Sequence, residues 1–455
     1  MFSHKKKILK NLFWGKSLPR ISFLIFLIIL ASFSSVHGAD ISSSVGTDID
    51  AAANLTADAN NAPGNKSGSI WPDTLYARYA AVIDAANGRV LFEKDGYTPA
   101  PNASTTKILT CILALEYGAS DDVLTVSRYA ASMPDVQLNI TTGEQYYLRD
   151  LLYSLMLQSH NDSAVAIAEN IAALYLCTGN ESAQALAATP ADKRSMEDSK
   201  TLVQLFANEM NRKAASLGCT SSYFITPNGL DATDDLGTHS TTAVDLAHIM
   251  AYCITNPEFL QITQSSSHQF TSISGKSTRG VHNTNAFLSM MDGVLSGKTG
   301  FTGNAGYCYV CAIERDNRRF IAVVLACGWP NNKTYKWKDT RALLTSAVNH
   351  YFLENVFSPV EQFQDIPVQN GIEPQIQTKI NAAAQLLLST DDRINITYDY
   401  PSSIEAPVHQ NDIIGYANIY VNDTLYQALP IQSCSDVERI DFFYCISQII
   451  HEYLF

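Results

Sequence analysis

The sequence predicts an α+β protein: an antiparallel sheet covered by helices, with an all-helical lobe inserted, followed by a small β-rich domain. Three observations predict this. Two β-like runs come first and are joined around Asn87-Gly88, a strong short hairpin signal. A long stretch with helical spacing follows, and then three strand-like runs with short connections, which indicate an antiparallel meander. Beyond about residue 355 the pattern changes to alternating strand-like pieces.

The elements of the first domain can be placed in order. The hairpin strands are expected at Tyr79–Asp84 and Arg89–Glu93, and helices are expected to begin near Ser104, to run from Leu148 to about Leu176 with a break at 159–163, and to recur from Leu202 and from Ser240. The later strands are expected at Gly293–Gly300, Tyr307–Glu314 and Phe320–Cys327, and a closing helix at Thr340–Phe352. Residues 177–200 are polar and irregular, which predicts an exposed insertion.

The first 38 residues indicate a secretory signal. Six lysines and arginines without an acid precede the apolar run Ile21–Phe33, and small residues follow it up to Gly38-Ala39. We expect cleavage after Gly38. The alternative is an uncleaved membrane anchor, since the apolar run is short for a span. Residues 39–72 lack a hydrophobic period and are expected to form a flexible spacer.

This organisation predicts a main domain at 73–352, a β-rich stalk domain at 353–437 and an amphipathic segment at 438–455. The last segment is too polar to span a bilayer. It is expected either to lie on a membrane surface or to pack on the domain before it.

The net charge and the cysteine content disfavour nucleic-acid binding and a cysteine-based metal or redox site. The 455-residue chain has a formal charge of −13, and removal of the signal with its six basic residues makes it −19. Such an acidic protein is a poor nucleic-acid binder. The nine cysteines are odd in number and show no disulfide framework. Cys308 and Cys311 lie in a strand-like run, where positions i and i+3 point to opposite faces, which predicts buried free thiols rather than a metal or redox pair.

Ser104 stands three residues before Lys107. In a helix that begins here, positions i and i+3 share a face, so the Lys107 amine would reach the Ser104 hydroxyl. A serine becomes a nucleophile when a neighbour takes its proton, and a desolvated lysine can be that neighbour. By itself the spacing also fits a helix N-cap followed by a solvated lysine.

Two further segments carry polar groups suited to acyl transfer. Ser159-His160-Asn161 offers a hydroxyl and an amide on a tight connection between helices. Lys298-Thr299-Gly300 offers an ammonium and a hydroxyl at the end of a strand, where Lys298 could bind a carboxylate, Thr299 could add a hydrogen bond, and Gly300 would let a substrate backbone approach. Taken singly, each segment also fits a helix cap or an ordinary strand end.

In this chain order the three segments match S-x-x-K, S-x-N and K-T-G, the signature of the penicillin-recognising serine enzymes. With their flanks, and with Pro227–Asp231 and His239–Ala243, they resemble the D-alanyl-D-alanine carboxypeptidases, which are low-molecular-mass penicillin-binding proteins. The resemblance covers about residues 75 to 352. It implies the β-lactamase/transpeptidase-like fold, peptidoglycan stem peptides as partners, β-lactams as covalent inhibitors, and no metal or cofactor.

The resemblance also implies roles for individual residues. Ser104 would attack the carbonyl of the penultimate D-alanine, with Lys107 as the base, and Ser159 would relay a proton to the leaving amine. Asn161 would hold the substrate amide, and Lys298 and Thr299 the terminal carboxylate. The oxyanion would lie between the backbone N–H groups of Ser104 and Phe301.

The cellular location follows from two features. The signal predicts export. Asn102-Ala103-Ser104 is a glycan acceptor triplet that would block the nucleophile in a eukaryotic secretory pathway, so we expect a bacterial protein. It would lie at the outer face of the cytoplasmic membrane or in the cell wall.

The sequence departs from the family pattern in two places. The middle residue of S-x-N is commonly glycine, and here it is His160, which could crowd the cleft or shift its pH response. We expect it to be exposed on the loop. Residues 177–200 are an insertion that could alter substrate access.

Two other functions stay open. A β-lactamase shares all three motifs, but no Glu-x-x-Leu-Asn segment lies between the second and third. A non-catalytic β-lactam or peptidoglycan sensor would be favoured by the loss of a motif residue, and none is lost. A metalloprotease is disfavoured because His239, His248 and His282 lack metal-ligand spacing.

Overall fold

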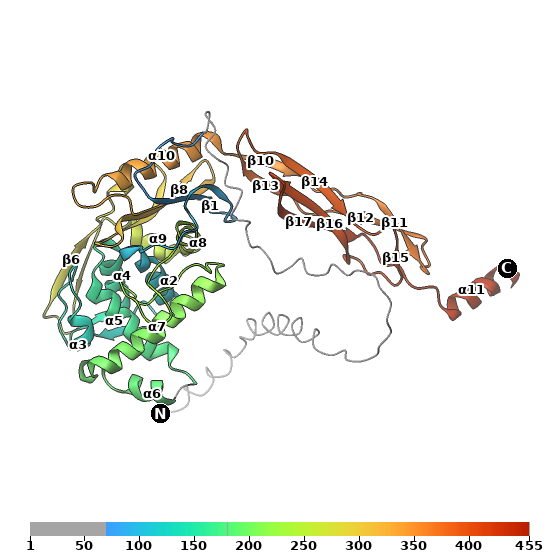
Figure 1. Ribbon diagram of the computed structural model, residues 1–455. Coiled ribbons are helices and arrows are strands. Elements are labelled where there is room, and N and C mark those ends of the chain that lie inside the picture. Colours follow the sequence, from blue (N-terminus) through green and yellow to red (C-terminus); the bar gives the residue numbers. More distant parts are fainter. Residues whose placement is uncertain (1–69, 180, 455) are drawn as a thin grey trace, which may run out of the picture. The chain divides into compact units, whose positions relative to one another are not determined.

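The computed structural model describes residues 70–179 and 181–454 (Figure 1). The predicted signal at 1–38 and residues 39–69 of the predicted spacer lie outside the described residues. In the described part of the chain, no helix is both long enough and apolar enough to cross a membrane. The predicted domain boundaries stay a prediction.

An antiparallel five-stranded sheet forms the centre of the first domain, with the strand order β2-β1-β9-β8-β7. The strands are β1 (Tyr79–Asp84), β2 (Val90–Lys94), β7 (Val294–Thr302), β8 (Gly306–Arg315) and β9 (Arg318–Leu325). The predicted hairpin and the predicted meander are both present, and pairing of β1 with β9 joins them into one sheet. β7 is left at one edge.

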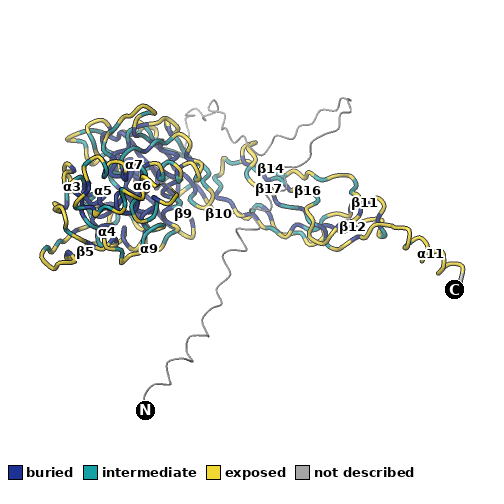
Figure 2. Tube along the Cα trace, turned by 90° about the horizontal axis from the view of Figure 1, so that it is seen from below, coloured by how far each residue is buried: buried dark blue, intermediate teal, exposed yellow. Residues whose placement is uncertain are grey.

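Both faces of this sheet are buried, as the alternation along β8 shows. Cys308 and Val310 belong to the core shared with the helical lobe, whereas Tyr309 and Cys311 belong to the core beneath α10 (Tyr335–His350). Helix α8 (Ala243–Cys253) packs on the first face. Cys308 and Cys311 are therefore buried free thiols on opposite faces, as predicted. Figure 2 shows the buried residues gathered inside this domain.

The predicted helical lobe is inserted between β2 and β7, which confirms the predicted fold class. Its helices are η1 (Ala103–Thr106), α2 (Lys107–Tyr117), α3 (Arg128–Ala131), α4 (Leu148–Leu157), α5 (Asn161–Ile171) with its π-helical continuation η2 (Ala172–Leu176), α6 (Glu181–Ala188), η3 (Ala191–Lys193), α7 (Met196–Ser216), α9 (Pro257–Gln264) and η4 (Ala286–Ser289). Two short hairpins pair β3 (Val123–Thr125) with β4 (Gln145–Tyr147) and β5 (Ser267–Thr271) with β6 (Thr278–His282). Every residue of α5 is buried, so this helix is the centre of the lobe.

The prediction that residues 177–200 are irregular is wrong, whereas most of the described residues of this segment are exposed or half-buried, as expected. The segment contains α6 and η3, and α7 begins within it, at Met196, after a capping box at Ser195. Arg194 is buried and pairs with the buried Glu169 of α5, with 2.9 Å between Nη1 and Oε1. The reason for the error is that this tertiary ion pair, formed with a residue 25 positions earlier, ties a polar sequence to the core.

Replacement of Arg194 by methionine is expected to destabilise the lobe strongly. Glu169 would keep only the hydroxyl donors of Ser127 and Ser199, and a buried carboxylate without its cation costs about 3–5 kcal/mol. The midpoint of thermal unfolding, followed by circular dichroism on the full chain, should fall by about 10 °C. Lys193→Met, an adjacent exposed position, is the matched control. Equal midpoints for the two variants would contradict the stabilising role of the Arg194–Glu169 ion pair.

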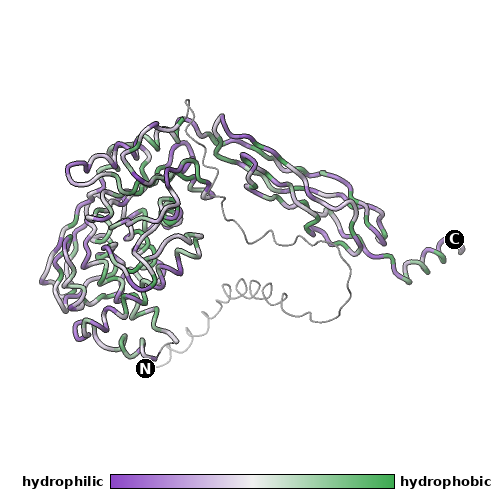
Figure 3. The backbone as a smooth tube through the Cα atoms, in the orientation of Figure 1, coloured by the Kyte–Doolittle hydropathy of each residue, from purple (hydrophilic) through white to green (hydrophobic). Residues whose placement is uncertain are grey.

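The second domain is built from strands, as predicted. Two of them, β10 (Phe352–Phe357) and β13 (Ala384–Leu388), form a ribbon, and six form a sheet in the order β14-β16-β17-β12-β11-β15. The six are β11 (Asp365–Gln369), β12 (Gln375–Lys379), β14 (Ile394–Asp399), β15 (Ile404–Glu405), β16 (Ile413–Val421) and β17 (Thr424–Ser433). Hydrophobic and hydrophilic residues alternate along these strands (Figure 3).

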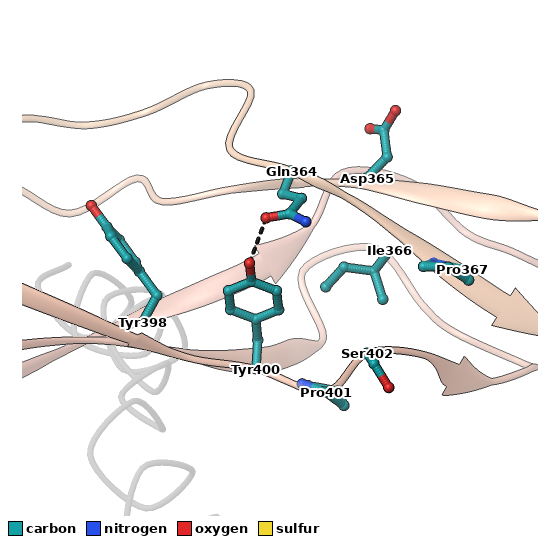
Figure 4. Close-up of a pocket in the computed structure, with 8 residues that line it drawn as sticks. All are labelled: Gln364, Asp365, Ile366, Pro367, Tyr398, Tyr400, Pro401 and Ser402. Carbon is teal, nitrogen blue, oxygen red and sulfur yellow. Dashed lines mark hydrogen bonds between the residues drawn. The ribbon is translucent and has the colours of Figure 1, made fainter.

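A groove of about 790 Å³ lies between β11 and the end of β14 (Figure 4). Its lining residues are Gln364, Asp365, Ile366, Pro367, Tyr398, Tyr400, Pro401 and Ser402. The Tyr400 hydroxyl donates to Gln364 Oε1 at 2.5 Å, which ties the segment after β14 to the start of β11. The edge strand β14 is thereby linked through side chains to β11, the strand next to the opposite edge of the sheet.

Helix α11 (Phe442–Leu454) forms the predicted amphipathic end. Its described side chains are exposed apart from the half-buried Tyr444, and they include Phe442, Phe443, Ile449 and Tyr453. The alternative of packing on the domain before it is therefore not seen among the described residues. Its position on a membrane surface stays a prediction.

Candidate active site

Ser104 lies in η1, one turn before Lys107 begins α2. The Lys107 amine is 2.7 Å from the Ser104 hydroxyl oxygen, the contact that the i, i+3 spacing predicts. Ser104 is half-buried, so its oxygen stays accessible, whereas Lys107 has no exposed surface. The pair therefore combines a reachable hydroxyl with an amine shielded from water.

The surroundings of Lys107 favour its neutral form. Burial, and then the ammonium group of Lys298, hold the pKa of Lys107 well below its usual range, and only Asp162 opposes them. Lys107 also contacts the side-chain oxygen of Asn161 at 2.8 Å and the backbone oxygen of Asn228 at 2.7 Å. These contacts fix the amine beside the Ser104 oxygen.

The Asn228 carbonyl is a part of the site to which sequence reasoning gave no role. Its place depends on Gly229, which has φ +79°, and a Cβ there would lie 1.9 Å from the backbone oxygen of Ala103. Only glycine allows the loop to come this close to the residue before Ser104. The sequence analysis used Pro227–Asp231 only for the family resemblance. The Asn-Gly pair in this segment is typical of a turn, but it does not indicate which segment the turn contacts.

Ser159 and Lys298 form a second pair, close enough to the first for the Lys298 charge to act on Lys107. Lys298 Nζ donates to the Ser159 hydroxyl at 2.9 Å and to the Thr299 backbone oxygen at 2.8 Å. Ser159 adopts φ +68°, a strained conformation for a residue with a side chain, at the sharp link between α4 and α5. Burial lowers the pKa of Lys298 to about 7.

Asn161 is the first residue of α5 and is fully engaged by its own chain. Its amide nitrogen donates to the backbone oxygens of Pro134 and Asp135, at 3.1 and 3.0 Å, while its oxygen accepts from Lys107. Its predicted role in holding a substrate amide therefore requires an exchange of one of these contacts.

The expectation that His160 is exposed on the loop is wrong. Only 6% of its surface is accessible, and its Nδ1 lies 2.8 Å from the Ser154 hydroxyl, which in turn contacts the Ser163 hydroxyl. Burial lowers the pKa of His160 to about 4. The error arose because these two serines, six residues before and three residues after it, offer a polar site inside the lobe. His160 thus anchors the turn that carries Ser159 and Asn161.

The remaining predicted residues lie on β7, next to the Ser104 loop. A Cβ on Gly300 would lie 2.9 Å from both the Ser104 nitrogen and the Asn102 oxygen. The absent side chain therefore allows β7 to contact the loop of the chain itself, a reason different from the substrate approach that we expected. Thr299 is half-buried, and Phe301 is 42% exposed with its ring 4.7 Å from that of Tyr307.

A family profile described as D-alanyl-D-alanine carboxypeptidase matches residues 66–175 and 172–328, which include all of these positions. The chain belongs to this family. A second profile, described as the C-terminal domain of penicillin-binding protein 5, matches residues 354–439. The resemblance that the motifs indicated is thus confirmed. The chain is thus a member of the low-molecular-mass penicillin-binding proteins, which are serine peptidases of cell wall peptidoglycan. Proteins of this family are extracytoplasmic.

Individual relatives are consistent with this family assignment. The chain is 25% identical over 375 residues to D-alanyl-D-alanine carboxypeptidase DacF of Bacillus subtilis, covering 80% of this chain and 87% of that protein. It is 31% identical over 249 residues to DacB2 of Mycobacterium tuberculosis, covering 54% and 72%. The crystal structure of penicillin binding protein 5 from Haemophilus influenzae has a similar fold, with TM-score 0.61 at 21% identity, covering 82% of this chain and 100% of that one.

Proposed function

We propose that this protein is a serine-type D-Ala-D-Ala carboxypeptidase that removes the terminal D-alanine from peptidoglycan stem peptides and is inhibited by β-lactams. One observation carries the proposal. The buried Lys107 amine lies 2.7 Å from the Ser104 oxygen, in surroundings that lower its pKa. A lysine held neutral can take a proton at neutral pH, which an ordinary solvated lysine cannot do.

In the first half-reaction, Ser104 Oγ bonds to the carbonyl carbon of the penultimate D-alanine while its proton passes to the neutral Lys107 amine. The carbonyl electron pair moves onto oxygen, where the backbone N–H groups of Ser104 and Phe301 would stabilise it. The short separation between Gly300 and the Ser104 nitrogen supports this arrangement, because it holds the strand that carries Phe301 beside the nucleophile.

Collapse of this intermediate breaks the C–N bond and releases D-alanine. The leaving nitrogen needs a proton, and the Ser159 hydroxyl is suited to relay to it the proton that Lys107 took from Ser104. Lys298 donates a hydrogen bond to Ser159 at 2.9 Å, which orients that hydroxyl while Lys298 keeps its own proton and its charge. The same Lys298, with Thr299, would bind the terminal carboxylate of the substrate. Water then attacks the carbonyl carbon of the Ser104 ester while Lys107 takes one of its protons. The bond from that carbon to Ser104 Oγ breaks, Ser104 recovers the proton from Lys107, and the shortened peptide leaves with the water oxygen in its new carboxylate.

The two lysines predict a bell-shaped pH profile of kcat/KM. On the acid side the rate falls as Lys107 becomes protonated, at a pH well below the usual lysine pKa. On the alkaline side it falls as Lys298 loses its charge, at about pH 7 in the free enzyme. Lys298→Arg should keep its charge and move the alkaline limb to higher pH. An unmoved alkaline limb would assign that limb to another group.

The deciding experiment uses the full chain. It is incubated with a fluorescent penicillin and, separately, with a D-Ala-D-Ala tripeptide, and the Ser104→Ala variant serves as the control. Stable labelling together with release of D-alanine is expected. Labelling without release would support a sensor, and rapid turnover of the penicillin would support a β-lactamase.

A further inference from the structure

His239 is a buried histidine next to the nucleophile turn, and the proposed reaction gives it no role. Only 2% of its surface is accessible, and its ring packs edge-on against that of Phe224, with 5.6 Å between the ring centroids. Burial lowers the pKa of His239 to about 4, so the ring is uncharged at neutral pH. A neutral imidazole has one donor nitrogen and one acceptor nitrogen, so its contacts can be assigned.

The contacts of this ring determine which nitrogen carries the hydrogen. Nδ1 accepts from the backbone N–H groups of Ile225 and Thr226, at 3.0 and 3.3 Å. The hydrogen of the neutral ring must then be on Nε2, which lies 2.9 Å from the Thr106 hydroxyl oxygen and donates to it. The ring thus connects the segment before Pro227 to the residue that immediately precedes Lys107.

Thr106 is the last residue of η1, between Ser104 and Lys107. It is buried, and its hydroxyl oxygen also accepts from Asn102 Nδ2 at 2.9 Å. Asn102 directly precedes the turn, whereas His239 is 133 residues away in the sequence. The bond from His239 therefore ties the short nucleophile turn to a distant segment, at a place where water cannot replace it.

The other end of the ring holds the loop that faces the same two catalytic groups. Thr226 is two residues before Asn228, whose carbonyl oxygen lies 2.7 Å from the Lys107 amine and 3.4 Å from the Ser104 hydroxyl oxygen. A single rigid ring thus sets the separation between the nucleophile turn and the loop with this carbonyl. A misplacement of reacting groups by about 1 Å can cost about a hundredfold in rate.

We propose that His239 is a positioning residue for acylation, whose hydrogen bond to Thr106 holds Ser104 and Lys107 in the geometry for proton transfer. The inference rests on the proposed function and adds to it a residue outside the three motifs. In this role His239 does not hold the substrate. Its loss should therefore slow acylation without weakening the reversible binding of a penicillin.

The test uses two substitutions in the full-length protein that each keep one end of the ring. In His239→Gln the side-chain amide can still donate to Thr106, whereas in His239→Asn the shorter amide can accept from Ile225 but does not reach Thr106. The acylation rate at saturating fluorescent penicillin should fall about a hundredfold in His239→Asn and be about tenfold higher in His239→Gln than in His239→Asn. The penicillin concentration that gives half of the maximal rate should stay unchanged in both. His248→Asn, at a half-buried histidine of α8, is the matched control and should acylate at the unsubstituted rate.

Thr106→Val tests the same bond from its other end and leaves the backbone contacts of His239 intact, so it decides the matter if His239→Asn does not fold. Asn102 Nδ2 keeps the Thr105 hydroxyl as an acceptor, at 3.1 Å. Thr106→Val should slow acylation about as much as His239→Asn, and the double variant should lose no more than either single variant.

The possible failures are distinguishable. An unchanged rate in His239→Asn and Thr106→Val, additive losses in the double variant, a glutamine variant as slow as the asparagine variant, or a change confined to the half-saturating concentration would overturn this inference alone. A failure of the unsubstituted protein to be labelled would overturn the proposed function and this inference with it.

Discussion

Replacement of Ser104 by alanine is expected to abolish covalent penicillin labelling and to lower the release of D-alanine by at least about ten-thousand-fold. The reason is chemical rather than structural. Without the hydroxyl no ester can form, and Lys107 has no proton to accept. Because the roles of nucleophile and base depend on each other, the loss should approach that of removing both.

The fold of this variant should be retained. Ser104 is half-buried, and Lys107 keeps its contacts with Asn161 and Asn228 when the hydroxyl is removed. The midpoint of thermal unfolding is therefore expected to change by only a few degrees. Ser402→Ala, at an exposed serine of the second domain, is the matched control and should label fully. Persistent labelling of Ser104→Ala, located by peptide mapping, would assign the nucleophile to another residue.

Replacement of Lys107 by either methionine or arginine is expected to slow acylation by about a thousandfold, near the middle of the range for a general base. Methionine removes the amine and retains the apolar stem. Arginine retains the positive charge, but its guanidinium cannot be deprotonated in proteins. A base requires the neutral form, so both variants should fail.

The comparison of these variants separates two roles of Lys107. If Lys107 acted only as a fixed positive charge, arginine would restore much of the acylation rate that methionine loses. The measurement is the second-order rate constant for labelling by a fluorescent penicillin, which requires no peptide turnover. Lys200→Met, at an exposed lysine of α7, controls for the loss of a positive charge in an acidic protein.

The two lysines also explain why the site needs a buried interior. Burial is the largest influence on the pKa of each, and Lys298 further lowers the pKa of Lys107. In water this repulsion between ammonium groups would be screened within about 10 Å at moderate salt. Inside the protein it persists, so one lysine can act as a base while the other keeps a charge for the carboxylate.

The sequence by itself determined the local geometry of this protein. The i, i+3 spacing of Ser104 and Lys107 predicts their contact. Because successive side chains of a strand point to opposite faces, the sequence also predicts that Cys308 and Cys311 lie on opposite faces of β8. The order of the three motifs indicated the family. These conclusions needed only helix and strand periodicity and residue types at short spacing, which are properties of the chain itself.

Only the tertiary structure decided the surroundings of the site residues and of the buried polar groups. The burial of His160, the approach of the Asn228 carbonyl to Lys107 and the pairing of Arg194 with Glu169 each depend on segments that the sequence does not place side by side. Desolvation and long-range charge act through space, so a lysine that is ordinary in the sequence can act as a base only when the fold encloses it. The hydrophobic periodicity of a sequence describes one helix or strand at a time and does not show which other elements pack against it.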